Sequence, residues 1–188
     1  MRTLMALMLC GLVVLVSGWT SGMHQATPTC ATPVNPLWGI DRESGSRVIR
    51  AVQIPGPSGT ALYTRWCGPA TARVHLDGAS FLLRSGHCIG KPTSYFVRVG
   101  LMANPPARPA KWVGLFIRNR RAAVDGGTVR LEDTAANFSY ANIQLGGPRL
   151  EIASGKITIG RSMRDGTFAF RLQDATRVTG SWTCGASA

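Results

Sequence analysis

The stretch WCGPATARVHLDGASFLLRSGHC, residues 66–88, decides the fold of this chain. Residues 70–76 alternate small or apolar side chains with Arg and His, which is the period-two pattern of a half-buried strand. Asp77-Gly78 supplies the left-handed backbone that a two-residue type I′ turn requires, and residues 80–84 return along the first strand. The stretch therefore predicts a β-hairpin with a cysteine at each foot.

The N-terminal residues have the layout of a secretory signal peptide. Met1 and Arg2 give a short positive start, residues 3–16 are apolar without a charge, and small residues follow. The apolar run is shorter than the roughly 20 residues that span a bilayer, so no transmembrane anchor is expected. We predict a secreted or cell-envelope protein with three parts, namely a signal peptide over 1–22 (cleavage after Gly18, Gly22 or Ala26), an extended proline-containing leader over 23–46, and a single β domain over 47–188.

Cleavage leaves four cysteines, Cys30, Cys67, Cys88 and Cys184, and an even number in an exported chain predicts two disulfides. Three pairings are possible. Cys67 and Cys88 each lie ten residues from the Asp77-Gly78 turn, so the hairpin geometry favours Cys67–Cys88 and leaves Cys30–Cys184. Neither a Cys-x-x-Cys motif nor paired histidines are present, so no metal and no cofactor are expected.

Short strands separated by turns fill the rest of the chain. Turn signals such as Asp125-Gly126-Gly127, Ser154-Gly155 and Asp165-Gly166 recur every eight to twelve residues, and no sustained helical period is visible. This spacing predicts an all-β fold, an antiparallel β-sandwich or barrel-like domain of about eleven short strands stapled by disulfides. On the last strand Trp182 and Cys184 share one face, which places Cys184 in the core beside Trp182.

The charge is strongly positive, with 21 basic residues, eighteen of them arginine, against nine acidic ones. Such a field favours polyanions or anionic surfaces, and the planar arginine fork suits phosphate and carboxylate groups. The alternative is a solvated basic surface that reflects an arginine-rich composition. The candidate contacts for an anionic polymer or envelope surface are the cluster Arg118, Arg120 and Arg121 and the arginines on strand faces expected to point outward, foremost Arg73, Arg98 and Arg171, with Arg84 and Arg177. No recognition helix is evident, so sequence-specific nucleic-acid binding is not expected.

No catalytic motif is visible. A nucleophile needs a base and a group that orients this base, but His87 and Cys88 are adjacent and should point to opposite faces of a strand. No Gly-x-Ser-x-Gly elbow exists. We therefore expect a non-catalytic binding or structural module, and the alternative is a small secreted hydrolase whose site is assembled from scattered residues such as His75, His87 and Glu151.

Three short features resemble the mycobacterial lipoprotein antigen family. They are Cys67 on an early strand, Asn104-Pro105-Pro106 ahead of Val113-Gly114-Leu115, and a final strand that ends in Cys184. The resemblance implies an exported cell-envelope β-protein and assigns no catalytic residue. The chain departs from that family because it lacks the cysteine for lipid attachment and carries the additional Cys88.

Overall fold

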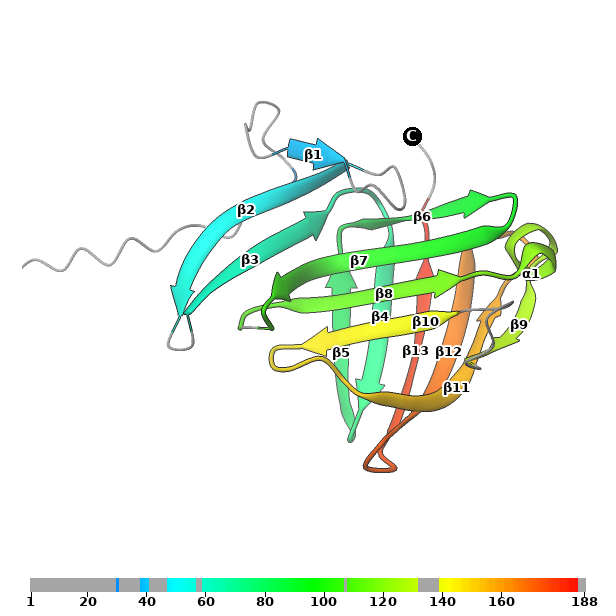
Figure 1. Ribbon diagram of the computed structural model, residues 1–188. Helices are drawn as coiled ribbons and strands as arrows, with labels where there is room; N and C mark the ends of the chain where they lie inside the picture. Colours follow the sequence, from blue (N-terminus) through cyan, green and yellow to red (C-terminus); the bar gives the residue numbers. More distant parts are fainter. Residues whose placement is uncertain are drawn as a thin grey trace, which may run out of the picture.

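The structure is a computed structural model that describes residues 30, 38–40, 47–56, 59–106, 108–131 and 139–185. Most of these residues lie in β-strands that form two sheets, and every paired strand is antiparallel to its neighbour (Figure 1). The sheets pack face to face, and their strands cross one another rather than running side by side (Figure 1). The predicted all-β antiparallel sandwich is confirmed.

The first sheet contains seven strands: β1 (Trp38–Ile40), β2 (Arg47–Gly56), β3 (Gly59–Trp66), β6 (Gly86–Lys91), β7 (Ser94–Asn104), β8 (Lys111–Ile117) and β10 (Tyr140–Leu145). Their order is β1-β2-β3-β7-β8-β10, and β6 also pairs with β7. The first half of the long β7 pairs with β6, whereas its end pairs with β3. The β2–β3 hairpin consequently reaches beyond the second sheet (Figure 1).

The second sheet contains six strands: β4 (Thr71–Leu76), β5 (Ala79–Arg84), β9 (Gly127–Arg130), β11 (Ile152–Ile159), β12 (Asp165–Leu172) and β13 (Arg177–Thr183). Their order is β5-β4-β13-β12-β11-β9. The predicted hairpin is its β4–β5 pair, in which Leu76 lies opposite Ala79. Asp77 and Gly78 take the positive φ angles, 49° and 76°, that the tight turn requires.

The core lies between the sheets and follows the alternation of their strands. Val97, Val99 and Leu115 of the first sheet are fully buried, and so are Phe170 and Trp182 of the second within a few per cent. Aromatic rings fit because some cross-strand neighbours are glycines. A Cβ atom on Gly166, opposite Trp182, would lie 2.2 Å from the Trp182 ring.

Four local features differ from the sequence prediction. Asp165-Gly166, interpreted as a turn, begins β12 and pairs with Thr183 and Trp182 of β13. The described residues contain thirteen strands, and the short β1 and β6 were not expected. Ser154-Gly155, interpreted as a turn, lies inside β11, where the register with β12 shifts as in a β-bulge. A short helix, α1 (Arg120–Asp125), precedes β9, and the Asn119 side chain caps it by accepting a hydrogen bond from the Ala122 amide at 3.0 Å.

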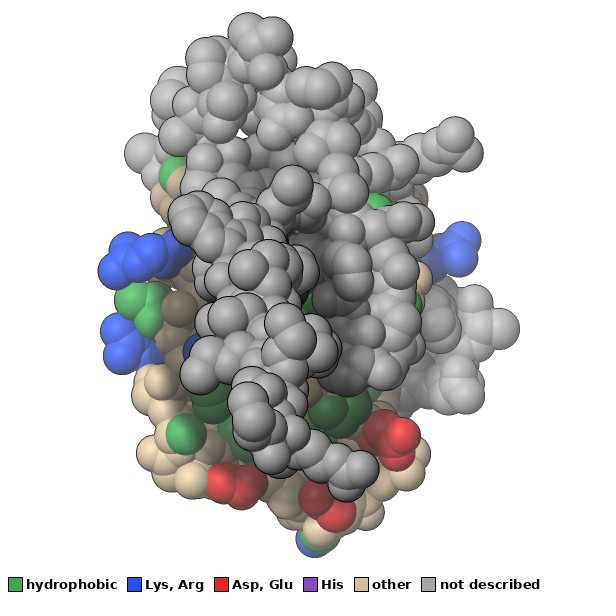
Figure 2. All heavy atoms as spheres, turned by 90° about the vertical axis from the view of Figure 1, so that its left-hand side faces the viewer, with side chains coloured by type: hydrophobic (Ala, Val, Ile, Leu, Met, Phe, Trp, Pro, Cys, Tyr) green, Lys and Arg blue, Asp and Glu red, His purple; other side chains and the backbone are tan. Residues whose placement is uncertain are grey.

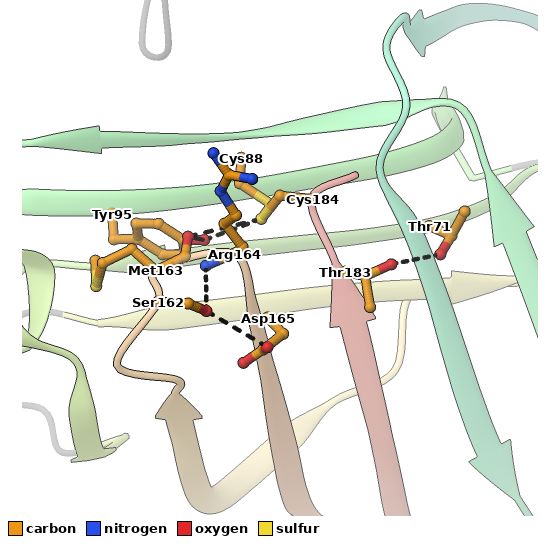
Figure 3. Close-up of a disulfide and its surroundings, with 9 residues drawn as sticks. All are labelled: Thr71, Cys88, Tyr95, Ser162, Met163, Arg164, Asp165, Thr183 and Cys184. Atoms are coloured by element: carbon orange, nitrogen blue, oxygen red, sulfur yellow. Dashed lines mark hydrogen bonds between the residues drawn. A yellow bond between two sulfur atoms is a disulfide. The ribbon is translucent and has the colours of Figure 1, made fainter. Parts of the chain in front are cut away.

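All four cysteines form disulfides, but the predicted pairing is wrong. The bonds are Cys30–Cys67 and Cys88–Cys184 instead of Cys67–Cys88 and Cys30–Cys184. The hairpin register ends at the Thr71–Arg84 pair, and the chain then enters β6, a strand of the other sheet. There Cys88 packs against the core, and its partner Cys184 follows the last strand of the second sheet (Figure 3). This disulfide therefore joins the two sheets.

The two disulfides indicate an oxidising, extracellular type of environment. In the described part of the chain, no helix has the length and apolar character needed to cross a membrane. The predicted signal peptide over 1–22 lies outside the described residues, as does most of the 23–46 leader, so both remain predictions.

Candidate functional site

The outward face of the second sheet gathers exposed basic side chains. Alternation along β4, β5, β9, β11, β12 and β13 sends one set of residues into the core and the other set outward. The outward set includes six exposed cationic residues, which we call the basic face: Arg73, Arg84, Arg130, Lys156, Arg171 and Arg177. The residues between them are mostly small and hydroxylated.

Two like-charge pairs lie on the basic face. The strand register places Arg171 of β12 directly opposite Arg177 of β13, and Lys156 of β11 directly opposite Arg130 of β9. Like charges directly opposite each other in an antiparallel pair are destabilising. An anion seated between or beside the two cations would relieve that repulsion.

A hollow separates these two pairs. One depression of about 390 Å³ is lined by Arg171 and Arg177, and another of about 410 Å³ is lined by Arg130 and Lys156. Both depressions share Ser154, Gly155 and Ala169 as lining residues. Gly155, just after the bulge of β11, and the small Ala169 of β12 both line the hollow. A Cβ atom on Gly155 would lie 2.5 Å from the Ala169 carbonyl oxygen.

Hydroxyl groups account for many of the other outward residues of this face. Thr71 and Thr183 hydrogen-bond through their hydroxyls at 3.0 Å, and Thr128 and Thr158 do the same at 2.9 Å. These cross-strand pairs stabilise the sheet. Threonine side chains are shorter than those of arginine and lysine, so the cationic groups project farther from the sheet than the residues around them.

Carboxylates are sparse on the basic face. Asp165, the first residue of β12, is the one carboxylate among the described residues of this face. Asp77 and Asp174 lie in the β4–β5 and β12–β13 turns, and Glu151 immediately precedes β11. In the view of Figure 2, basic side chains lie mainly on the two flanks of the molecule, and the acidic side chains lie in its lower part. Positive charge therefore predominates among the described residues of this face.

The structure separates the arginines singled out from the sequence into three places. Arg73 and Arg171 are exposed on the basic face. Arg118 and Arg121 are exposed near α1, which packs against β6, β7 and β9 instead of β4, β12 or β13. The backbone of Arg120 lies in α1, but its side chain is outside the described part of the structure. The cluster and the strand arginines do not form one site.

The predicted exposure of Arg98 is wrong, because this side chain is buried with only 4% of its surface exposed. Alternation along β7 does place it opposite Val97 and Val99, but that face is not solvent. Its guanidinium donates a hydrogen bond to the Tyr140 hydroxyl at 3.3 Å and lies 5.7 Å from the Phe96 ring centre and 5.9 Å from that of Trp112. The alternation of the strand was correct, and the exposure inferred from it was wrong.

A pocket of about 490 Å³ lies beside the Cys88–Cys184 disulfide. Its lining includes His87, Lys91 and Arg164, and it contains no carboxylate from the described residues. His75 is exposed on β4 and Glu151 is exposed ahead of β11, and neither lines this pocket. The structure therefore does not bring the three residues considered for a hydrolase together in the pocket.

Tyr95 forms the inner wall of that pocket. Its hydroxyl donates a hydrogen bond to the Met163 carbonyl oxygen at 2.8 Å and lies 3.1 Å from the Cys184 sulfur (Figure 3). Burial raises the pKa of Tyr95 to about 12. The neutral phenol is therefore favoured by the folded state.

We expect Tyr95 to make the protein sensitive to alkali. A group whose folded pKa is raised contributes stability below its unfolded pKa of about 10, and this contribution is lost as the pH rises to about 12. The difference in unfolding free energy between wild type and Tyr95→Phe should therefore shrink from pH 9 to pH 12. Urea titrations across this range measure it, and a difference that stays constant with pH would contradict the assignment.

Comparison with protein-family models, with curated proteins and with solved structures finds no match to this chain. The assignment of function therefore depends on the residues of the basic face and on the pockets.

Proposed function

We propose that this protein is an exported, non-catalytic binding module that holds an anionic polymer across its basic face. The observation that carries the proposal is the pair of like-charge cross-strand contacts, Arg171–Arg177 and Arg130–Lys156, on either side of one hollow. Among the described residues, no carboxylate lines either depression to offset the repulsion within each pair. A chain of phosphate, sulfate or carboxylate groups supplies the missing negative charge.

The dimensions of a sheet suit such a polymer. Neighbouring strands lie about 4.8 Å apart, so the two cations of each pair stand on adjacent strands at about that spacing. Arginine binds an oxyanion through two parallel N–H donors, and the surrounding threonine hydroxyls can donate further hydrogen bonds. None of these contacts requires a particular monomer, so binding should follow charge density more than sequence or sugar identity.

The proposal includes a location outside the cell or in the cell envelope. The disulfides are compatible with an extracellular environment, and the resemblance to the mycobacterial lipoprotein antigens supports an envelope location. Anionic polymers of an envelope or an extracellular surface are the partners that this location offers.

Binding should weaken steeply as salt rises, because each neutralised anionic group releases a condensed counterion. We expect the wild type to bind long-chain polyphosphate at 50 mM salt and to lose most of this affinity by 200 mM. The triple variant Lys156→Ala, Arg171→Ala and Arg177→Ala should bind more weakly, and the slope of log K against log salt should flatten by about 2 to 3. Fluorescence anisotropy with labelled polyphosphate measures both quantities.

A charge-matched control variant distinguishes binding at the basic face from a general effect of the protein's net charge. The variant Arg118→Ala, Arg120→Ala and Arg121→Ala removes the same three charges near α1 and should change the slope much less. Lys156, Arg171 and Arg177 are exposed on strands, and Arg118 and Arg121 are exposed just before and within α1, so thermal unfolding should change little. Equal losses in the two triple variants would contradict a footprint on the basic face, and no wild-type binding at 50 mM salt would contradict the proposed function.

A further inference from the structure

A second basic pocket lies at one corner of the sandwich, where the edge strand β5 meets the first sheet, and it shares Arg84 with the basic face. Its volume is about 320 Å³, and its lining comes from β3, β5, β7 and β8 and from the loop before β8. Arg65, Arg84 and Lys111 are its charged lining residues, and no described carboxylate shares the lining with them. Three cations therefore border one small concave site.

The strand register explains how two of these cations face each other. Arg65 of β3 lies opposite Leu101 of β7, and Leu101 lies opposite Lys111 of β8. The two cationic residues thus occupy the same row on either side of Leu101, with backbones about 10 Å apart from two strand spacings. Arg84 comes from the second sheet and supplies a third side. Lys111 reaches toward that sheet, since its Nζ atom lies 5.4 Å from the Phe81 ring centre.

The Arg65 side chain contains an unsatisfied hydrogen-bond donor. Its Nε atom is buried and has no hydrogen-bond partner in the structure. Burial lowers the pKa of Arg65, because the guanidinium is partly removed from water. A buried donor on a charged group is costly to leave unsatisfied, so an acceptor at this position would be strongly favoured.

The other walls of the corner pocket are apolar. Leu82, Leu83, Leu101 and Pro109 line it, and Leu82 is 48% exposed at the rim. Leu83 packs close to the β7 backbone because residue 100 is a glycine. A Cβ atom added at Gly100 would lie 3.2 Å from the Leu83 side chain. A ligand in this pocket would meet cations on three sides and aliphatic groups beside them.

We propose that the corner pocket binds a small amphiphilic oxyanion, a phosphate or carboxylate that carries a short alkyl group. The oxyanion accepts hydrogen bonds from Arg65, Arg84 and Lys111, and the alkyl group packs on Leu82 and its neighbours. This site does not depend on polymer binding by the basic face, because its three cations differ from the two pairs that flank the hollow.

The probes for this site are butyl phosphate, butyrate and inorganic phosphate, each titrated into the intact protein by calorimetry. We expect butyl phosphate to bind about tenfold more tightly than inorganic phosphate, because the butyl group buries aliphatic surface on Leu82. Leu82→Asn should abolish this preference while leaving the affinity for inorganic phosphate unchanged. Comparison of butyl phosphate with butyrate then tells whether the natural head group is a phosphate or a carboxylate.

Substitutions of the three cationic lining residues test whether butyl phosphate binds in the corner pocket. Arg84→Ala and Lys111→Ala replace exposed side chains and should each weaken butyl phosphate about tenfold, and Arg65→Gln should weaken it at least as much. The triple variant Arg118→Ala, Arg120→Ala and Arg121→Ala near α1 is the control and should bind butyl phosphate like the wild type. Absence of binding, or equal losses in the control and the Arg84 and Lys111 variants, would overturn the corner pocket and leave polyphosphate binding by the basic face untouched.

Discussion

Replacing Cys88 and Cys184 with serine should lower the unfolding free energy by about 4 to 5 kcal/mol. The two cysteines are 96 residues apart in sequence, and the chain-entropy model gives about 4.7 kcal/mol for a loop of that length. The bond also joins the two sheets beside Tyr95, so its loss exposes part of the core to water. Urea denaturation of the double variant against the wild type measures the effect.

The second disulfide is the matched control for this prediction. Cys30–Cys67 closes a shorter loop, with a separation of 37 residues, and the same model gives about 3.8 kcal/mol for it. Removing Cys88–Cys184 should therefore destabilise the protein more than removing Cys30–Cys67. The reverse order, or a loss below about 2 kcal/mol for Cys88–Cys184, would contradict its role as the covalent link between the sheets.

Local patterns predicted the strands well, because alternation and turn chemistry act over a few residues. Asp77-Gly78 forms the expected hairpin turn. Trp182 of β13 is buried in the core, and Cys184, just after that strand, packs against the core as predicted. The proline-containing segment after Asn104 forms the expected break between β7 and β8. The errors at Ser154-Gly155 arose because a glycine in a bulge and a glycine in a turn look alike in sequence.

Contacts between distant strands could not be predicted in the same way. The symmetric spacing of Cys67 and Cys88 about the hairpin turn was real, but it could not show that the chain changes sheets at Ser85. Arg98 was placed on the correct face of β7, yet the aromatic side chains around it come from β8 and β10 as well as β7. Exposure depends on such neighbours and not on the period of one strand.

The candidate sites depend on the same long-range register. Arg171 and Arg177 are close in sequence, and their hairpin could have been inferred from Asp174 and its turn. Arg130 and Lys156 face each other only because β9 pairs with β11. The corner pocket needs residues from three strands of one sheet and one of the other, so no pattern in the sequence indicates it.

Trp182 is the core side chain whose truncation should lower the unfolding free energy most. It is 1% exposed and lies between β12 and β4, where its cross-strand partners are Gly166 and Ala72. Both partners are too small to fill the space that an alanine at position 182 would leave. A cavity that cannot collapse adds its own cost to the lost transfer free energy of the side chain.

We therefore expect Trp182→Ala to lower the unfolding free energy by about 4 to 5 kcal/mol, near the top of the range for large-to-small core substitutions. Trp182→Phe is the control and should cost much less, because a phenyl ring still covers Gly166. Gly166→Ala should destabilise the wild type, since its new methyl group meets both the indole ring and the Thr158 carbonyl oxygen. Trp182→Ala removes the first of these clashes, so Gly166→Ala should cost less beside it than in the wild type. A double-mutant cycle by urea denaturation measures this coupling, and additive effects would mean that the indole ring does not pack on Gly166.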